Sequence, residues 1–152
     1  MTRPIEYENL IRTGAFASVQ STAGAVEGFL AHAEDYLAVA ETLDIARSMQ
    51  VFTLAYEGTY QVVQAVLEHY EVRTKDAGRN AAILRVCADL KLSPQETQRL
   101  AAAHARRNGT AYQSPFPPIS KAEATLLVSI LKKLIPAAYA LTGQQRDQAA
   151  GR

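Results

Sequence analysis

The chain has 152 residues, of which 16 are basic and 15 are acidic, so its formal net charge is +1. This length favours a single domain with a core large enough to fold without disulfides. The near-zero net charge excludes a broad cationic surface, so any contact with a nucleic acid must be local. The single cysteine, Cys87, lies among apolar residues and is expected to be buried in a reducing compartment.

The sequence carries no pattern typical of export or of a membrane span. The first residues lack a basic segment followed by an apolar run, and Lys or Ser residues interrupt the longest apolar stretches. We therefore expect a soluble cytoplasmic protein with no membrane partner.

The first half of the chain predicts two long helices. Residues 1–20 mix Pro, Gly and Ser with a short apolar patch, which predicts a loose arm or a short helix. Apolar residues recur every three or four positions from residue 21 or 22 to Leu43, which predicts an amphipathic helix. A longer helix is predicted to follow Asp44, its N-cap, and to reach Tyr70 with two apolar stripes. Because both stripes need cover, this helix is predicted to be the centre of the core.

The second half predicts three more helices, the first a short one that follows a break at residues 74–78. Ser93, Pro94 and Glu96 combine an N-cap, a proline in the first turn and a capping glutamate, so a helix is predicted to begin there and to end before the prolines at 115–118. A second capping box at residues 120–123 begins the last helix, which is predicted to end at Thr142 and Gly143.

No segment shows the alternation typical of a strand, so we predict an all-α, up-and-down bundle of about five helices. Pro136 removes one backbone hydrogen bond and is predicted to kink the last helix. The predicted organisation is an arm or short helix at residues 1–20, a bundle at 21–142 and a disordered polar tail at 143–152.

The most informative stretch reads RLAAAHARRNGTAYQ and spans residues 99–113. If its helix continues past Gly109, a rotation of about 100° per residue places four polar side chains on one side. These are His104, Arg107, Asn108 and Tyr112. An imidazole, a guanidinium, an amide and a phenol on one side predict an anion site. The alternative is an ordinary helix end, in which Arg106 and Arg107 complement the helix dipole and Gly109 ends the helix.

Motifs for other chemistries are missing. No Glu is followed three residues later by His, and His32, His69 and His104 lie on three different predicted helices, so no metal site is expected. The glycines form no phosphate loop, and Cys87 has no base near it in sequence. We expect no cofactor.

From about Thr22 to Leu141 the sequence resembles the HEPN family, whose helical domains are associated with nucleotide and RNA chemistry. The similar features are an Ala-rich first helix (AHAEDYLAVAETL), a long second helix (TLAYEGTYQVVQAVLEHY), Arg107-Asn108 followed by Tyr112, and a final helix of the type EATLLVSILKKL. The resemblance implies a HEPN-like bundle. It also implies a homodimer in which two copies of a motif, Arg followed after four to six residues by His, meet in one cleft.

Many proteins of this family are metal-independent RNases. In such a site the Arg binds the scissile phosphate while the His moves the proton of the 2′-hydroxyl. Here Tyr112 occupies the position of the motif His. A phenol with a pKa of about 10 is a poor base at neutral pH, so the expected RNase activity is weak or absent. His104, one turn before Arg107, is a second candidate for the proton-handling group.

The expected function is binding of RNA or a nucleotide through Arg106, Arg107 and Asn108, linked to toxin–antitoxin or defence systems. The first alternative is an active metal-independent endoribonuclease with Arg107, Tyr112 and His104 as catalytic residues. The second alternative is a structural or partner-binding helical dimer.

Two partners are expected besides the ligand. The resemblance implies a nucleotidyltransferase-type antitoxin that modifies Tyr112. The two apolar stripes of the long helix predict a homodimer, because five helices in one chain do not suffice to cover them.

Overall fold

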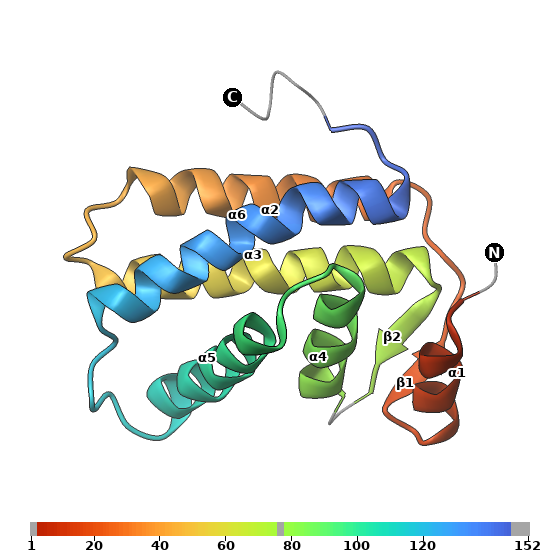
Figure 1. The fold of residues 1–152 in the computed structure, drawn as a ribbon, viewed down its shortest axis with the longest axis horizontal. Helices are drawn as coiled ribbons and strands as arrows, with labels where there is room; N and C mark the ends of the chain where they lie inside the picture. The colour runs from red at the N-terminus through yellow and green to blue at the C-terminus, as the bar shows by residue number, and fades with distance from the viewer. Residues whose placement is uncertain (1–2, 76–77, 147–152) are drawn as a thin grey trace.

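The structure is a computed structural model that describes residues 3–75 and 78–146. Over these residues it has six helices and one two-stranded sheet, so the predicted helical class is confirmed (Figure 1). The elements in chain order are α1 (Ile5–Arg12), β1 (Phe16–Ser18), α2 (Ala25–Thr42), α3 (Ser48–His69), β2 (Val72–Thr74), α4 (Arg79–Asp89), α5 (Pro94–Tyr112) and α6 (Lys121–Thr142).

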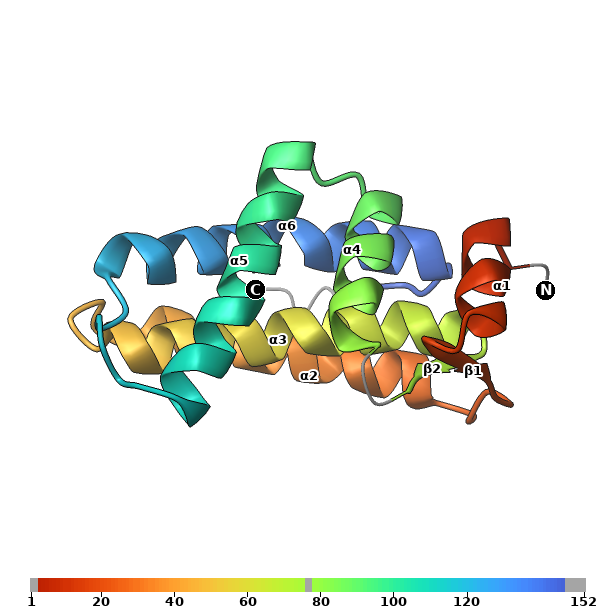
Figure 2. The ribbon, with the colours of Figure 1, turned by 90° about the horizontal axis from the view of Figure 1, so that it is seen from below.

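Helix α3 is the central helix, as predicted. Helices α2 and α6 pack along it, and α4 and α5 lie across its other side (Figure 2). Most of both predicted stripes is buried, with Phe52 and Tyr56 representing one and Val62 and Val66 the other. The first stripe was predicted to begin too early, because Ile45 and Met49 are exposed. One chain thus covers α3 on both sides, so the need to cover α3 no longer supports a homodimer.

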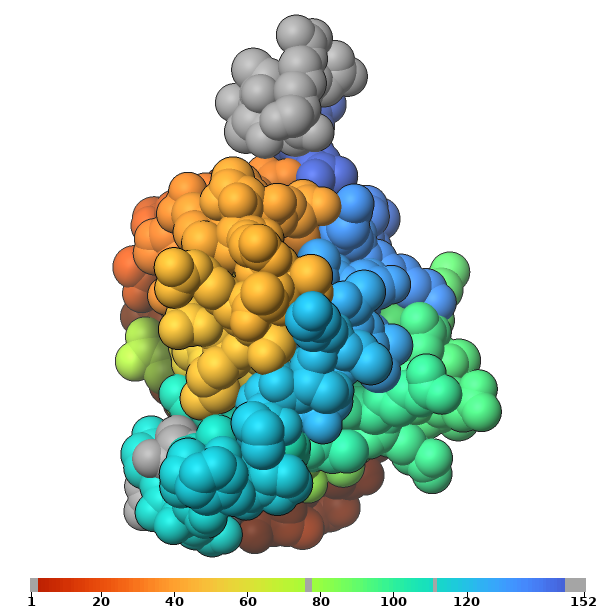
Figure 3. Space-filling model, turned by 90° about the vertical axis from the view of Figure 1, so that its left-hand side faces the viewer, coloured from red at the N-terminus to blue at the C-terminus, as the bar shows by residue number. Residues whose placement is uncertain are grey.

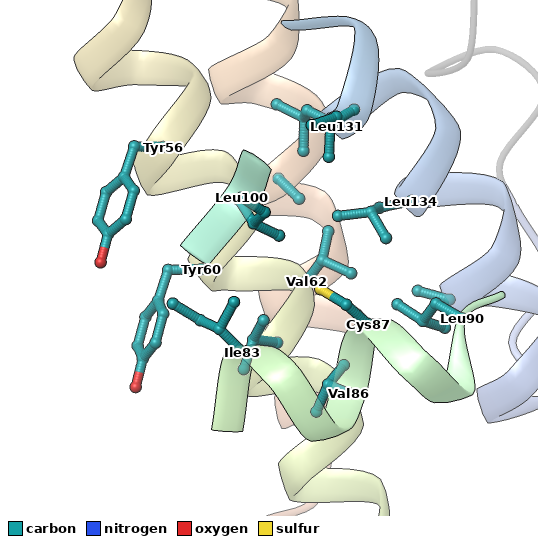
Figure 4. Packing of buried hydrophobic residues seen from close by; sticks show 14 of the residues in the cluster. Tyr56, Tyr60, Val62, Ile83, Val86, Cys87, Leu90, Leu100, Leu131 and Leu134 are labelled. Atoms are coloured by element: carbon teal, nitrogen blue, oxygen red, sulfur yellow. The ribbon is translucent and has the colours of Figure 1, made fainter. Parts of the chain in front are cut away.

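The core where α3, α4 and α6 meet contains the single cysteine (Figure 4). Cys87 is buried beside Val62 and Ile83, as its apolar sequence neighbours predict. Burial raises the pKa of this thiol to about 12, so it stays protonated at neutral pH.

The strongest predicted helix boundary is confirmed. The Ser93 Oγ accepts a hydrogen bond from the Glu96 N–H at 3.1 Å, and the Glu96 carboxylate accepts one from the Ser93 N–H at 3.0 Å. The predicted end of α6 is also confirmed, because Gly143 follows its last residue in the left-handed conformation.

The capping box predicted at the start of α6 forms only in part. The Ser120 Oγ accepts a hydrogen bond from the Glu123 N–H at 3.0 Å, as predicted. The Glu123 carboxylate instead binds Arg106 of α5, with 3.1 Å between Oε2 and Nε. A cation on a neighbouring helix therefore replaces the local backbone donor.

Two predicted helix starts are several residues too early. Helix α3 begins four residues after Asp44, because the Asp44 carboxylate accepts a hydrogen bond from the Ala46 N–H at 2.8 Å and closes a turn there. Helix α2 begins three residues after Thr22, whose N–H donates to the Glu68 carboxylate at 2.6 Å. Asp44 is used outside the helix that it was expected to begin.

The two strands were not predicted. They pair antiparallel, with Phe16 opposite Thr74. Strands of three residues are too short to show a clear alternation of apolar and polar residues. The sheet and α1 lie at one end of the bundle, where Tyr7 of α1 donates a hydrogen bond to Asp89 of α4 at 2.7 Å. The expected short helix within residues 1–20 is α1.

Helix α6 contains Pro136 in its interior, and the kink at this residue stays a prediction. Among the described residues, α6 is the one helix long and apolar enough to cross a membrane, with a mean hydropathy of 1.5, although no stretch of that length was expected. It packs against α2, α3 and α5, which fits a soluble bundle. Residues 147–152 of the predicted tail and 76–77 of the predicted break lie outside the described residues.

The start of α6 lies beside the connection between α2 and α3 (Figure 3). The Ser48 hydroxyl donates a hydrogen bond to the Ile119 carbonyl oxygen at 2.7 Å and joins the two segments.

Candidate functional site

A cavity of about 640 Å³ opens between α5, the start of α4 and the end of β2. This volume is in the usual range for small-ligand sites. Residues that line the cavity include Lys75, Arg79, His104, Arg107, Asn108 and Tyr112. The four residues of α5 predicted to share one side therefore border the same cavity. The alternative of a helix end is wrong, because α5 continues through Gly109 to Tyr112.

His104 is held in the cavity wall by Tyr56 of α3. The Tyr56 hydroxyl lies 2.7 Å from the His104 Nδ1, and the two rings stack with centroids 5.9 Å apart. Burial raises the pKa of Tyr56, so its hydroxyl stays protonated at neutral pH. The other ring nitrogen, Nε2, lies 3.4 Å from the Asn108 side-chain nitrogen. These contacts fix the orientation of the imidazole.

The imidazole of His104 is neutral at pH 7. Burial lowers its pKa from the usual 6.5, and the positive charges of Arg79 and Arg107 lower it further. A neutral imidazole is able to accept a proton, so His104 has the protonation state that a general base requires.

Arg107 is anchored to α3 by an ion pair. Its Nη2 donates to the Glu57 Oε1 at 2.9 Å, and its Nη1 donates to the Asn108 Oδ1 at 3.4 Å. The guanidinium also lies over two rings, 5.1 Å from the centroid of Tyr56 and 5.8 Å from that of Tyr112. Because a guanidinium has five N–H donors, these two bonds leave donors for a ligand.

Arg79 brings a second guanidinium to the cavity, and it was not among the residues predicted from the sequence. Its Cζ lies 4.1 Å from the centroid of the Tyr60 ring. Arg79 is the first residue of α4, where the helix dipole disfavours a cation, and this is the signal that could have identified it. With Lys75 and Arg107 it makes three cations that line the cavity, and Arg107 is paired with the Glu57 carboxylate. Among the described residues, basic groups therefore outnumber acidic ones at this site, although the whole chain is almost neutral.

The short sheet positions this second side of the cavity. The Lys75 N–H donates to the Ala15 carbonyl oxygen at 2.9 Å and extends the pairing of β1 and β2. Gly78 packs so closely on the same carbonyl that a Cβ atom there would lie 2.3 Å from its oxygen. Arg79 follows directly, so the sheet sets the start of α4 and the place of this guanidinium.

Arg106 lies on another face of α5 and does not join the cluster around His104. Its Nε binds the Glu123 carboxylate at 3.1 Å, and its Nη2 donates to the Pro118 carbonyl oxygen at 2.9 Å. A second, mostly apolar cavity of about 320 Å³ borders this face between α5 and α6. The structure therefore separates Arg106 from Arg107, although they are adjacent in sequence.

The remaining candidates lie elsewhere. Tyr112 is at the edge of the cavity with 75% of its surface exposed. His32 of α2 and His69 of α3 do not line the cavity. Within residues 3–75 and 78–146, no three His, Cys, Asp or Glu side chains group as metal ligands would.

No protein-family model matches the chain, and no curated protein matches it significantly.

Proposed function

We propose that this cavity binds phosphate groups of RNA or of a nucleotide and that the chain is a HEPN-like protein. The observation that carries the proposal is the meeting of Arg79, Arg107 and Lys75 around one cavity in a chain of net charge +1. A guanidinium binds a phosphate through two parallel charge-assisted hydrogen bonds. The Asn108 amide and the His104 imidazole supply further polar contacts.

We propose that RNase activity is weak or absent, because the phenol of Tyr112 is a poor base at pH 7. One observation favours the alternative of a metal-independent endoribonuclease, namely that an imidazole, His104, and a guanidinium, Arg107, line the same cavity. In that case Arg107 stabilises the charge that develops on the phosphate, and His104 accepts the proton of the 2′-hydroxyl.

The proposed partners rest mainly on the resemblance. A toxin–antitoxin or defence system and a nucleotidyltransferase-type antitoxin follow from it alone, and the exposure of Tyr112 leaves the phenol accessible to such an enzyme. The homodimer is supported by the exposed Phe116, which lies in the connection between α5 and α6.

Binding is tested with a fluorescently labelled single-stranded RNA, comparing Arg107→Ala with Arg106→Ala. Arg107→Ala should weaken binding about 10-fold to 100-fold, which corresponds to roughly 1.5–3 kcal/mol for hydrogen bonds to a charged group. Arg106→Ala is the matched control and should leave the affinity nearly unchanged, because Arg106 faces away from the cavity. Equal losses for both variants, or no binding by the wild type, would contradict the proposal.

The same samples, incubated in EDTA, decide between the binding protein and the endoribonuclease. We expect little or no cleavage by the wild type, and Tyr112→His should increase it by supplying a base that titrates near neutrality. Robust cleavage by the wild type that disappears in His104→Gln and Arg107→Ala would establish the endoribonuclease.

A further inference from the structure

Two tyrosines of α3 each lie beneath a guanidinium. Tyr56 and Tyr60 are one turn apart, and their hydroxyl groups point to the same side, away from the core leucines (Figure 4). Arg107 of α5 lies 5.1 Å from the centroid of the Tyr56 ring, and Arg79 of α4 lies 4.1 Å from that of the Tyr60 ring. Four residues of α-helix rise about 6 Å, so the two tyrosine rings lie on successive turns of α3. The Arg79 guanidinium also forms hydrogen bonds with the hydroxyl groups of both tyrosines.

The two guanidinium groups belong to the same cavity but are engaged differently. Both line it, and both lie close enough to His104 to act on its charge. Arg107 is paired with Glu57 and its side chain is only 19% exposed. Arg79 is exposed and has no carboxylate partner in the described part of the chain. No carboxylate of residues 3–75 or 78–146 therefore balances its charge, and an anionic ligand would do so.

We infer that the cavity binds two consecutive phosphates of one RNA strand, the first at Arg107 and the second at Arg79. The inference rests on the proposed phosphate binding and adds the Arg79–Tyr60 pair as a second phosphate subsite. Neighbouring phosphates of one strand are separated by a sugar, a spacing of the same order as one turn of α3. The two phosphates of a nucleoside diphosphate share a bridging oxygen and lie much closer together. The spacing therefore favours a single-stranded oligonucleotide over a mononucleotide.

Three ligands test this inference: uridine 5′-monophosphate, uridine 5′-diphosphate and 5′-phosphorylated diuridine. A 2′-O-methyl group on the first sugar of the diuridine prevents its cleavage. Calorimetric titration of the wild type should show the diuridine binding at least 10-fold more tightly than either mononucleotide. Arg79→Ala should remove this advantage while weakening the monophosphate no more than twofold, because Arg107 remains to bind it.

Two further variants separate the charge of Arg79 from its other effects. Arg79→Met keeps an apolar stem over the Tyr60 ring and should lose the same advantage as Arg79→Ala. Arg73→Ala removes an exposed cation of β2 that does not line the cavity, and it should change none of the three affinities more than twofold. The melting temperatures of all variants should match that of the wild type.

The outcomes distinguish this inference from the proposed function. No binding of any of the three ligands would overturn the proposed function. Equal affinities for uridine 5′-diphosphate and the diuridine would overturn only the inference. The inference would also be overturned if Arg79→Met still bound the diuridine more tightly than the mononucleotides. An Arg79→Ala variant that weakens all three ligands equally would also overturn it, because Arg79 would then belong to a single phosphate site.

Discussion

At the scale of single residues, Arg107 has two roles that a substitution separates. Besides its place at the cavity, Arg107 forms an ion pair with Glu57, so Arg107→Ala should also lower the stability. Both side chains are partly buried, at 19% and 29% exposure, so removing the arginine leaves a carboxylate without its cation. We expect a loss of about 1 kcal/mol in the free energy of unfolding, measured by urea denaturation.

The Glu57→Gln variant shows whether the ion pair causes this loss. Combined with Arg107→Ala, it should add little further destabilisation, because the pair is already broken. Fully additive effects of the two substitutions would mean that Arg107 stabilises the fold through its ring contacts instead.

His104 makes the stability depend on pH. Burial and the charges of Arg79 and Arg107 lower its pKa in the folded state, whereas the unfolded chain keeps a value near 6.5. The unfolded state therefore binds more protons below pH 7, so this contribution is complete above about pH 6.5 and is lost as the pH falls through the folded pKa. Urea denaturation between pH 7.5 and 5.5 should show a smaller loss of stability for His104→Gln than for the wild type.

His69 must be controlled for, because burial lowers the pKa of this histidine as well. The comparison is therefore made in a His69→Gln background, in which His104 is left as the histidine with a lowered pKa among the described residues. Parallel stability curves with and without the His104→Gln substitution would contradict the prediction.

At the scale of elements, the continuity of α5 through Gly109 determines which side chains reach the cavity. A glycine inside a helix costs about 0.5–1 kcal/mol relative to alanine. A Cβ atom at Gly109 would meet its nearest neighbour, the Gln113 Oε1, at 3.9 Å, which is an ordinary contact. Gly109→Ala should therefore raise the free energy of unfolding by about 0.5–1 kcal/mol.

The same substitution distinguishes the two interpretations of this stretch. If the helix ended at Gly109 in the left-handed conformation, alanine would be strained there and Gly109→Ala would lower the stability. Gly28→Ala in α2 is the matched control, because nothing lies within 4 Å of an added Cβ and it should stabilise to a similar degree.

At the scale of the whole molecule, one chain is sufficient to bury α3, so a homodimer needs another surface. Phe116 lies in the connection between α5 and α6 and is 74% exposed. Aromatic residues are enriched at interfaces, so we expect two copies to pair through this surface. Light scattering at micromolar concentration should return twice the chain mass of 16.5 kDa.

Phe116→Asp should reduce that mass to a single chain without changing the helical content, because Phe116 lies outside the core. A wild-type mass near 16.5 kDa would contradict the homodimer.

Much of the helical framework could be predicted from local patterns. The capping box at Ser93 and the left-handed Gly143 involve residues within one turn of each other, so their sequence specifies them. Asp44 and Glu123 misled the prediction, because each found a different hydrogen-bond partner from the one that its local sequence suggested. A local sequence pattern contains no information about the hydrogen-bond partners that other parts of the fold supply.

By itself, the sequence determined which side of α5 carries His104 and Arg107, because that side follows from the period of an α-helix. Only the tertiary structure decided what faces them. The partner of His104 is 48 residues away in sequence, the partner of Arg107 is 50 residues away, and Arg79 reaches the cavity from a third helix. These contacts depend on how α4 and α5 cross α3. Packing of side chains across three helices sets that crossing, and no local pattern in the chain specifies it.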